Sequence, residues 1–432
     1  MEGPRLSWGA VAHAPAHGQL RRRRRERLSA ADASNVVLDA DDQVNVFLMA
    51  GLLATSEPDA VLDLDRLRAE LAARLSGPAA DGLARFDQRV TPEPPLHWED
   101  CAPDLSWHVR RVAPVAGMSG LSELCATLMT RPLPLDRPLW ELLVVPGAAP
   151  GRTGVVLRVH HAVSDGVGAV RLMQRLFGSE PAARPPAPAT PRDAPRRPRL
   201  AGAARVLAML ATSIGPTRLL GEIGPQRGVG FAEVELDVLA SHARRHGATV
   251  NDALLAAVAG AAATVLHAAG EKLPETLPAS VPVALPDRGN SGNAVGVMRV
   301  ALPVREPEPA VRLARVAAET RQAKDEARAQ GTFELTRSRW GTRLFARLAR
   351  RQRFVALFVT NVRGPEQQLI VAGVPLVRAW PLAPIQGNVR LGVAAMSYAG
   401  RLGVAVHVDA SALPADLLAA ALTEELGRLA TG

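Results

Sequence analysis

The residues best suited to chemistry lie in the stretch VVLRVHHAVSDGVGAV, residues 155–170. A β-rich run there ends at His160 and His161, and Asp165 and Gly166 follow before a helical pattern begins. Since side chains alternate along a strand, the two histidines should point to opposite faces, one supporting the fold and the other reaching a cleft. Histidine suits general-base work because its ordinary pKa lies near neutrality. The alternative is a pair of core histidines followed by a helix-capping aspartate.

The two residues after the histidines have roles of their own in this interpretation. Asp165 would order the loop, with an arginine elsewhere in the chain as its partner. Gly166 would permit backbone crowding or an unusual dihedral angle. Parity groups His161 with Val155, Leu157 and Val159 without indicating which face of the strand meets the cleft.

The elements that must position this motif follow from local patterns. Around the motif, β-rich runs at 142–145 and 155–160 predict an antiparallel hairpin, and apolar spacing predicts helices at 62–75 and 167–177. Later in the chain, Ala399-Gly400 between two apolar alternating runs predicts a second hairpin. Helical patterns occupy 253–268 and about 414–429. This mixture indicates layered α/β or α+β architecture in both halves.

The spacing His-His-x-x-x-Asp-Gly matches the signature of the acyltransferase superfamily that includes chloramphenicol acetyltransferase and peptide-synthetase condensation domains. Further stretches, in this order along the chain, are similar to the bacterial wax ester synthase/acyl-CoA:diacylglycerol acyltransferase family. The resemblance covers about residues 28–430. The stretches are Pro134–Glu141 (PLDRPLWE), Asn251-Asp252, Pro282–Leu285 (PVAL), Gly292-Asn293, Thr360–Pro365 (TNVRGP) and Ser397–Leu402 (SYAGRL).

The resemblance implies an α/β (α+β) sandwich of two chloramphenicol-acetyltransferase-like halves with a tunnel at their interface. It implies an O-acyltransferase that moves a fatty acyl group from acyl-CoA to diacylglycerol or a long-chain alcohol, as in triacylglycerol or wax ester synthesis. His161 would be the general base and His160 a support. No cofactor or metal is expected, since acyl-CoA is a co-substrate. The oligomeric state, acyl length and acceptor are left open.

Three further residues are linked to the site by the resemblance. Asn251 would support the oxyanion, or would instead cap the helix that follows it. Trp140 would line the tunnel, or would instead be a buried anchor before a strand. Gly166 would lie against the substrate. The sequence departs from the family pattern where Pro286 replaces an expected arginine, with Arg288 two residues later, so the arginine partner of Asp165 is not assigned.

Charge and composition divide the chain into four parts. Residues 1–27 carry +5 and 179–200 carry +3 of the net charge of +9, so the basicity lies in an extension and a linker. We expect a disordered basic extension at 1–27, halves at 28–178 and 227–432, and between them, at 179–226, a Pro/Arg-rich linker with a connecting helix at 200–222. A nucleic-acid-binding domain would instead place its basic residues on one structured face, so none is expected.

Location follows from weaker signals. Two cysteines, Cys101 and Cys125, fit a reducing cytosol. The longest apolar run, 253–266, is shorter than the ~20 residues a membrane span needs. We therefore expect a cytoplasmic protein, with peripheral contact to the inner face of the membrane or to a lipid droplet.

Other enzyme classes fit the sequence less well. Gly289–Asn293 (GNSGN) lacks the last glycine of a serine-hydrolase elbow, and neither lysine, Lys272 or Lys324, follows a phosphate-binding loop. Two alternatives stay open. One is a condensation-type transferase with a carrier-bound acyl donor, and the other is a non-catalytic lipid-binding homologue.

Overall fold

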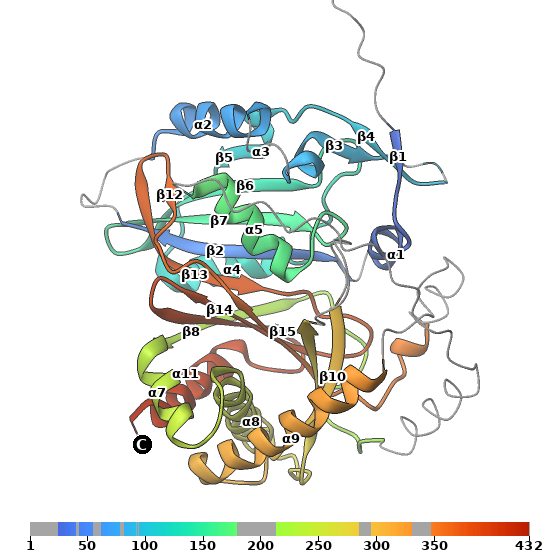
Figure 1. Cartoon of the computed structure of the whole chain (residues 1–432), viewed down its shortest axis with the longest axis vertical. Coiled ribbons are helices and arrows are strands. Elements are labelled where there is room, and N and C mark those ends of the chain that lie inside the picture. The colour runs from blue at the N-terminus through green and yellow to red at the C-terminus, as the bar shows by residue number, and fades with distance from the viewer. Residues whose placement is uncertain are drawn as a thin grey trace, which may run out of the picture.

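The computed structural model places two six-stranded sheets against each other, with helices on their outer faces (Figure 1). The mixed α/β architecture predicted from the sequence is confirmed. The structure describes residues 25–39, 43–54, 62–77, 82–91, 93, 95–178, 213–284, 295–330 and 347–431.

The first sheet belongs mostly to the N-terminal half. Its outer face packs against helices α2 (Leu64–Ser76) and α5 (Gly166–Phe177), and its inner face packs against helix α4 (Gly117–Leu128) and the second sheet. Its strands, in spatial order, are β12 (Ile370–Val371), β13 (Val374–Leu382), β2 (Val46–Leu53), β7 (Arg152–His160), β6 (Trp140–Ala149) and β5 (Val109–Arg111).

The second sheet forms the C-terminal half. Its strands, in spatial order, are β10 (Val295–Leu302), β9 (Leu277–Ala284), β11 (Leu357–Arg363), β14 (Leu391–Tyr398), β15 (Arg401–Asp409) and β8 (Arg227–Glu235). The helices that cover its outer face are α7 (Leu236–Arg245), α8 (Val250–Ala268), α9 (Pro309–Gln330) and α11 (Ala415–Thr431) (Figure 1).

Two strands, β12 and β13, cross from the C-terminal half into the first sheet. β13 lies in the C-terminal part of the sequence but pairs with β2, with Leu382 opposite Leu48 and Trp380 opposite Ala50. Trp380 and Leu382 are buried in the core between the sheets, so the crossing lets them fill that core. The half expected as 227–432 therefore contributes strands to the sheet of the half expected as 28–178, which the sequence pattern did not predict.

The expectation that 1–27 is wholly disordered is wrong at its end. Arg25–Arg27 form strand β1, which pairs with β4 (His97–Asp100), and β4 pairs with β3 (Gln88–Val90). The anchor is Glu99, whose buried carboxylate accepts hydrogen bonds from Arg25 and Arg89 at 2.7–3.0 Å. These arginines hold the pKa of Glu99 below its ordinary value.

The predicted connecting helix is wrong over the described part of its range. Residues 179–212 lie outside the described residues, and the part of the predicted helix at 213–222 is not helical. Leu220 instead forms a β-bridge with Val389, so this segment runs along the C-terminal half.

The two predicted hairpins are confirmed. β6 and β7 pair antiparallel, and so do β14 and β15. At the second turn Ala399 and Gly400 both have positive φ, 45° and 80°, as a tight two-residue hairpin requires. The predicted helices at 62–75, 167–177, 253–268 and 414–429 are also present as α2, α5, α8 and α11.

Helix α8 is long and apolar enough, by length and composition, to cross a membrane. It starts at a capping box formed by Thr249 and Asp252, which extends it beyond the apolar run seen in the sequence. Most of it is buried in the core of the C-terminal half, as in the central helix of a globular domain.

Candidate active site

Strand β7 ends at His160, and His161 is the next residue. Their side chains lie on opposite faces of the sheet, as the alternation along a strand predicts. His160 is completely buried. Its Nδ1 accepts a hydrogen bond from the Ala162 N–H at 3.0 Å, so the Nε2 carries the proton of the neutral ring. That Nε2 lies 3.4 Å from a carboxylate oxygen of Asp39. His160 therefore braces the turn after β7 and has no opening to a substrate.

His161 lies on the other face, the one that packs toward α2 and α5. Its ring meets Phe47 of β2 edge to face, with 5.9 Å between ring centroids. The residue is half-buried and its Nδ1 is buried. Burial, with a smaller contribution from the neighbouring His160, lowers the pKa of the ring to about 4, although the residue's own backbone opposes the shift. The imidazole is therefore unprotonated at neutral pH and able to accept a proton.

The backbone of His161 is held on both sides by residues that the sequence analysis did not single out. Its N–H donates to the Asn45 carbonyl at 2.9 Å, and its carbonyl accepts from Asn35 Nδ2 at 3.2 Å. Asp39 in turn accepts from the Asn45 N–H at 2.8 Å. The signal available was two asparagines and an aspartate just before a β-rich run. These residue types do not indicate a functional site unless their hydrogen-bond partners are known.

Asp165 is the N-cap of α5. One of its carboxylate oxygens accepts a hydrogen bond from the Gly168 N–H at 2.7 Å. Burial raises the pKa of Asp165, whereas the Gly168 bond and Arg171 oppose that rise. Within the described part of the chain no arginine forms an ion pair with Asp165, and Arg288 lies outside that part. Asp165 therefore caps α5, and its role in ordering the catalytic loop stays a prediction.

The prediction that Gly166 relieves crowding is wrong. Its φ is not positive, and an added Cβ would meet only Val362 Cγ1, at an ordinary 3.5 Å. The crowded glycine is Gly168, where a Cβ would lie 2.0 Å from Ser164 Oγ. Gly166 does, however, face β11 of the C-terminal half through Val362, so the start of α5 lies at the junction of the halves.

Two substitutions of Asp165 distinguish the contribution of its helix cap from that of its negative charge. Asp165→Ala should reduce the free energy of unfolding by about 1 kcal/mol and lower kcat, because the turn that carries His161 loses its anchor to α5. Asp165→Asn should keep both near the wild-type values, since asparagine caps as well as aspartate. Denaturant unfolding and turnover measure the two effects. If Asn and Ala variants lose equal activity, the carboxylate charge is required and capping is not the role.

Trp140 is fully buried rather than open to a passage. Its Nε1–H donates to the Phe86 carbonyl at 3.0 Å, and its ring packs against Phe86 and His108 with centroids 4.8 and 4.7 Å away. This geometry favours the buried-anchor alternative over the tunnel-lining one. The two ring nitrogens of His108 lie 2.8 and 3.2 Å from the carbonyl oxygens of Asp104 and Pro138, and the tautomer decides which of them accepts the N–H.

Asn251 lies in the first turn of α8, in the helical layer outside the second sheet. The cap of that helix is Thr249 rather than Asn251. Its neighbour Asp252 bonds Thr320 at 2.6 Å and secures α9. Among the residues that the structure describes, no hydrogen bond joins Asn251 to the histidine turn, so its support of the oxyanion stays a prediction.

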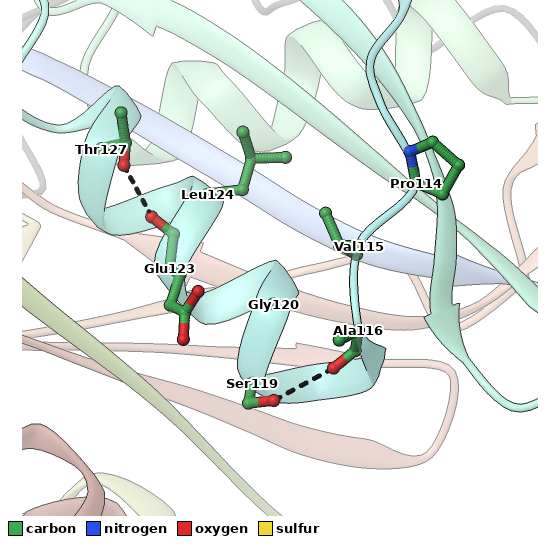
Figure 2. A pocket seen from close by; sticks show the side chains of 8 residues that line it. All are labelled: Pro114, Val115, Ala116, Ser119, Gly120, Glu123, Leu124 and Thr127. Carbon is green, nitrogen blue, oxygen red and sulfur yellow. Dashed lines mark hydrogen bonds between the residues drawn. The ribbon is translucent and has the colours of Figure 1, made fainter.

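Two cavities are formed by the described residues, and His161 lines neither of them. One, of about 390 Å³, runs along α4, where Ser119 and Thr127 hydroxyls already donate to backbone carbonyls of their own helix or its cap (Figure 2). The other, of about 690 Å³, lies between the halves and reaches Val44, next to the residue that holds His161. The tunnel through His161 stays a prediction, and segments 285–294 and 331–346 are outside the description.

Comparisons with known proteins show that the sequence of this chain is similar to those of acyltransferases. A family model for the wax ester synthase/diacylglycerol acyltransferase catalytic domain matches residues 28–215, and the C-terminal domain model of the same family matches 291–430. A Mycobacterium tuberculosis protein named as a putative diacylglycerol O-acyltransferase is 30% identical over 439 residues, covering 90% of this chain and 87% of the relative.

Solved structures share the fold. The wax ester synthase/diacylglycerol acyltransferase of Marinobacter aquaeolei superimposes with a TM-score of 0.69 at 22% identity, over 94% of this chain and 98% of that one. The first condensation domain of the CDA synthetase superimposes with a TM-score of 0.58 at 17% identity, over 94% and 95%. At these identities the likeness concerns the fold alone.

Proposed function

Because the chain belongs to the wax ester synthase/diacylglycerol acyltransferase family, we propose that it transfers a fatty acyl group from acyl-CoA to the hydroxyl of diacylglycerol or a long-chain alcohol. The observation that carries this proposal is His161. Its ring is unprotonated at neutral pH and partly exposed, and its backbone is held from both sides. Nδ1 is buried, so Nε2 is the nitrogen that would face the alcohol.

In this mechanism Nε2 of His161 accepts the proton as the alcohol oxygen attacks the thioester carbonyl. The tetrahedral intermediate then expels the coenzyme A thiolate, which takes the proton back from the imidazolium. A ring whose pKa is about 4 is a weak base but, once protonated, a strong acid toward the leaving sulfur. Attack and proton removal would therefore occur together. No covalent acyl-enzyme is formed.

We also propose that the lipid substrates reach the site from a membrane or droplet surface on the cytoplasmic side. Val167, the second residue of α5, is 47% exposed. Val297 of β10 is 62% exposed. Val167 lies where the start of α5 meets β11, and Val297 lies on the edge strand of the second sheet. Exposed apolar side chains at these places would favour contact with an apolar surface.

The test is incubation of the purified protein with palmitoyl-CoA and either dipalmitoylglycerol or hexadecanol, following free thiol and identifying the ester by mass spectrometry. We expect thiol release that depends on the alcohol and matches ester formation. Thiol release without an alcohol would indicate hydrolysis. Product only from a carrier-bound palmitoyl thioester would establish the condensation-type alternative, which the fold likeness to a condensation domain keeps open. No product from either donor would indicate a lipid-binding protein.

A further inference from the structure

Polar side chains join the loop before β2 to the loop between β13 and β14, and thus connect the two halves. Gln386 Nε2 donates to Asn45 Oδ1 at 2.8 Å. Beside it, Gln43 and the Gly387 backbone exchange two hydrogen bonds, at 2.8 and 2.9 Å. The two contacts are adjacent, but only the first involves a residue that touches His161.

Asn45 has one side-chain orientation that satisfies its neighbours. Its Oδ1 accepts from Gln386, and its Nδ2 donates to the Asn35 backbone carbonyl at 3.0 Å. Turning the amide over would set two NH₂ groups against each other at Gln386 and two oxygens against each other at Asn35. Asn45 is only 2% exposed, so water would not relieve the mismatch. The Asn35 carbonyl, which can only accept, sets the orientation of the Asn45 amide, and the bond from Gln386 holds Oδ1 in that orientation.

From Asn45 the connection continues to the base. The Asn45 carbonyl accepts the His161 N–H, and Asn35 Nδ2 donates to the His161 carbonyl. The backbone of His161 thus has both polar groups bonded to residues whose own positions depend on a side chain of the C-terminal half. A base misplaced by about 1 Å can lose about 10²-fold in rate.

We propose that Asn45 and Gln386 are positioning residues, which couple docking of the C-terminal half to the placement of His161. The proposal rests on the proposed function, in which His161 is the base. Neither side chain touches a reacting atom in this scheme. Their effect is to hold the imidazole where the alcohol and the thioester meet, so they should influence kcat rather than KM.

The experiment compares steady-state kinetics of Gln386→Ala, Asn45→Ala and the double variant in the palmitoyl-CoA assay. We expect Gln386→Ala to lower kcat about tenfold with KM changed less than twofold, and Asn45→Ala to lower it more. The double variant should match Asn45→Ala, because Gln386 acts through Asn45. Losses that simply multiply, or a change confined to KM, would overturn the proposal. If Asn45→Ala does not fold, Gln386→Ala decides.

Gln43→Ala is the matched control. It removes the neighbouring hydrogen bonds between the halves but leaves Asn45 and His161 untouched, so we expect a lower thermal midpoint and an unchanged kcat. An equal loss of kcat in this control would show that docking alone matters and would overturn the proposal.

Two further measurements separate this proposal from the one it rests on. NMR titration of the His161 ring should show a higher pKa in Gln386→Ala than in the wild type, because a loosened ring is better hydrated. An unchanged titration would count against positioning. An active His161→Ala would defeat the proposed function, whereas inactive His161→Ala together with fully active Gln386→Ala would defeat only the positioning role.

Discussion

His161→Ala should lower kcat by about 10²–10⁴-fold, the usual contribution of a positioned general base. The physical reason is that the other histidine of the motif cannot replace it as the proton acceptor. His160, the adjacent imidazole, is completely buried and its Nδ1 accepts from Ala162. The measurement is alcohol-dependent thiol release from palmitoyl-CoA at saturating alcohol.

The control for this variant is His267→Ala, which removes an exposed histidine at the end of α8. It should leave kcat unchanged, and both variants should unfold at wild-type denaturant concentrations within error. Equal thiol release from His161→Ala and the wild type would show that His161 is not the base.

The pH profile follows from the same residue. Since burial lowers the pKa of His161 to about 4, the ring stays unprotonated as pH falls from 8 to 6, and kcat/KM should be flat there. The rate should fall only as pH approaches that pKa and the ring becomes protonated. An acid limb near pH 6.5, the value of an exposed histidine, would contradict the buried environment.

Trp140→Ala should cost about 3–5 kcal/mol in the free energy of unfolding, the typical range for emptying a buried aromatic site. The indole is wholly buried, bonded to the Phe86 carbonyl and packed between Phe86 and His108. These neighbours belong to different elements, so they cannot close over the cavity without moving the sheet. Denaturant unfolding measures the loss. Turnover, measured well below the unfolding midpoint, should change less than twofold.

Trp140→Phe is the matched control. It keeps an aromatic ring but loses the Nε1–H, and should cost about 1 kcal/mol, the net value of one hydrogen bond. A large loss of kcat/KM in either variant without loss of stability would show that Trp140 contacts the substrate, as the tunnel alternative holds.

The part of the site that could be predicted from the sequence is the strand, turn and helix that carry the histidine motif. A strand followed by two histidines, an aspartate and a helix led to opposite faces for His160 and His161, and both are found there. The capping role of Asp165 was also within reach, because an N-cap bonds a backbone N–H only three residues away. The glycine in crowded surroundings is Gly168 and not Gly166, because the crowding comes from the Ser164 side chain, whose direction no sequence pattern specifies.

By itself the sequence determined most of the secondary elements and the family, and it singled out His161 as the proposed base, because side-chain periodicity, turn residues and motif spacing act over a few neighbouring positions. The tertiary structure decided what holds that base. Asn45 and Gln386 are 341 residues apart, and β13 crosses to β2 over a similar distance. Such pairings depend on how two sheets pack, and no local pattern encodes them.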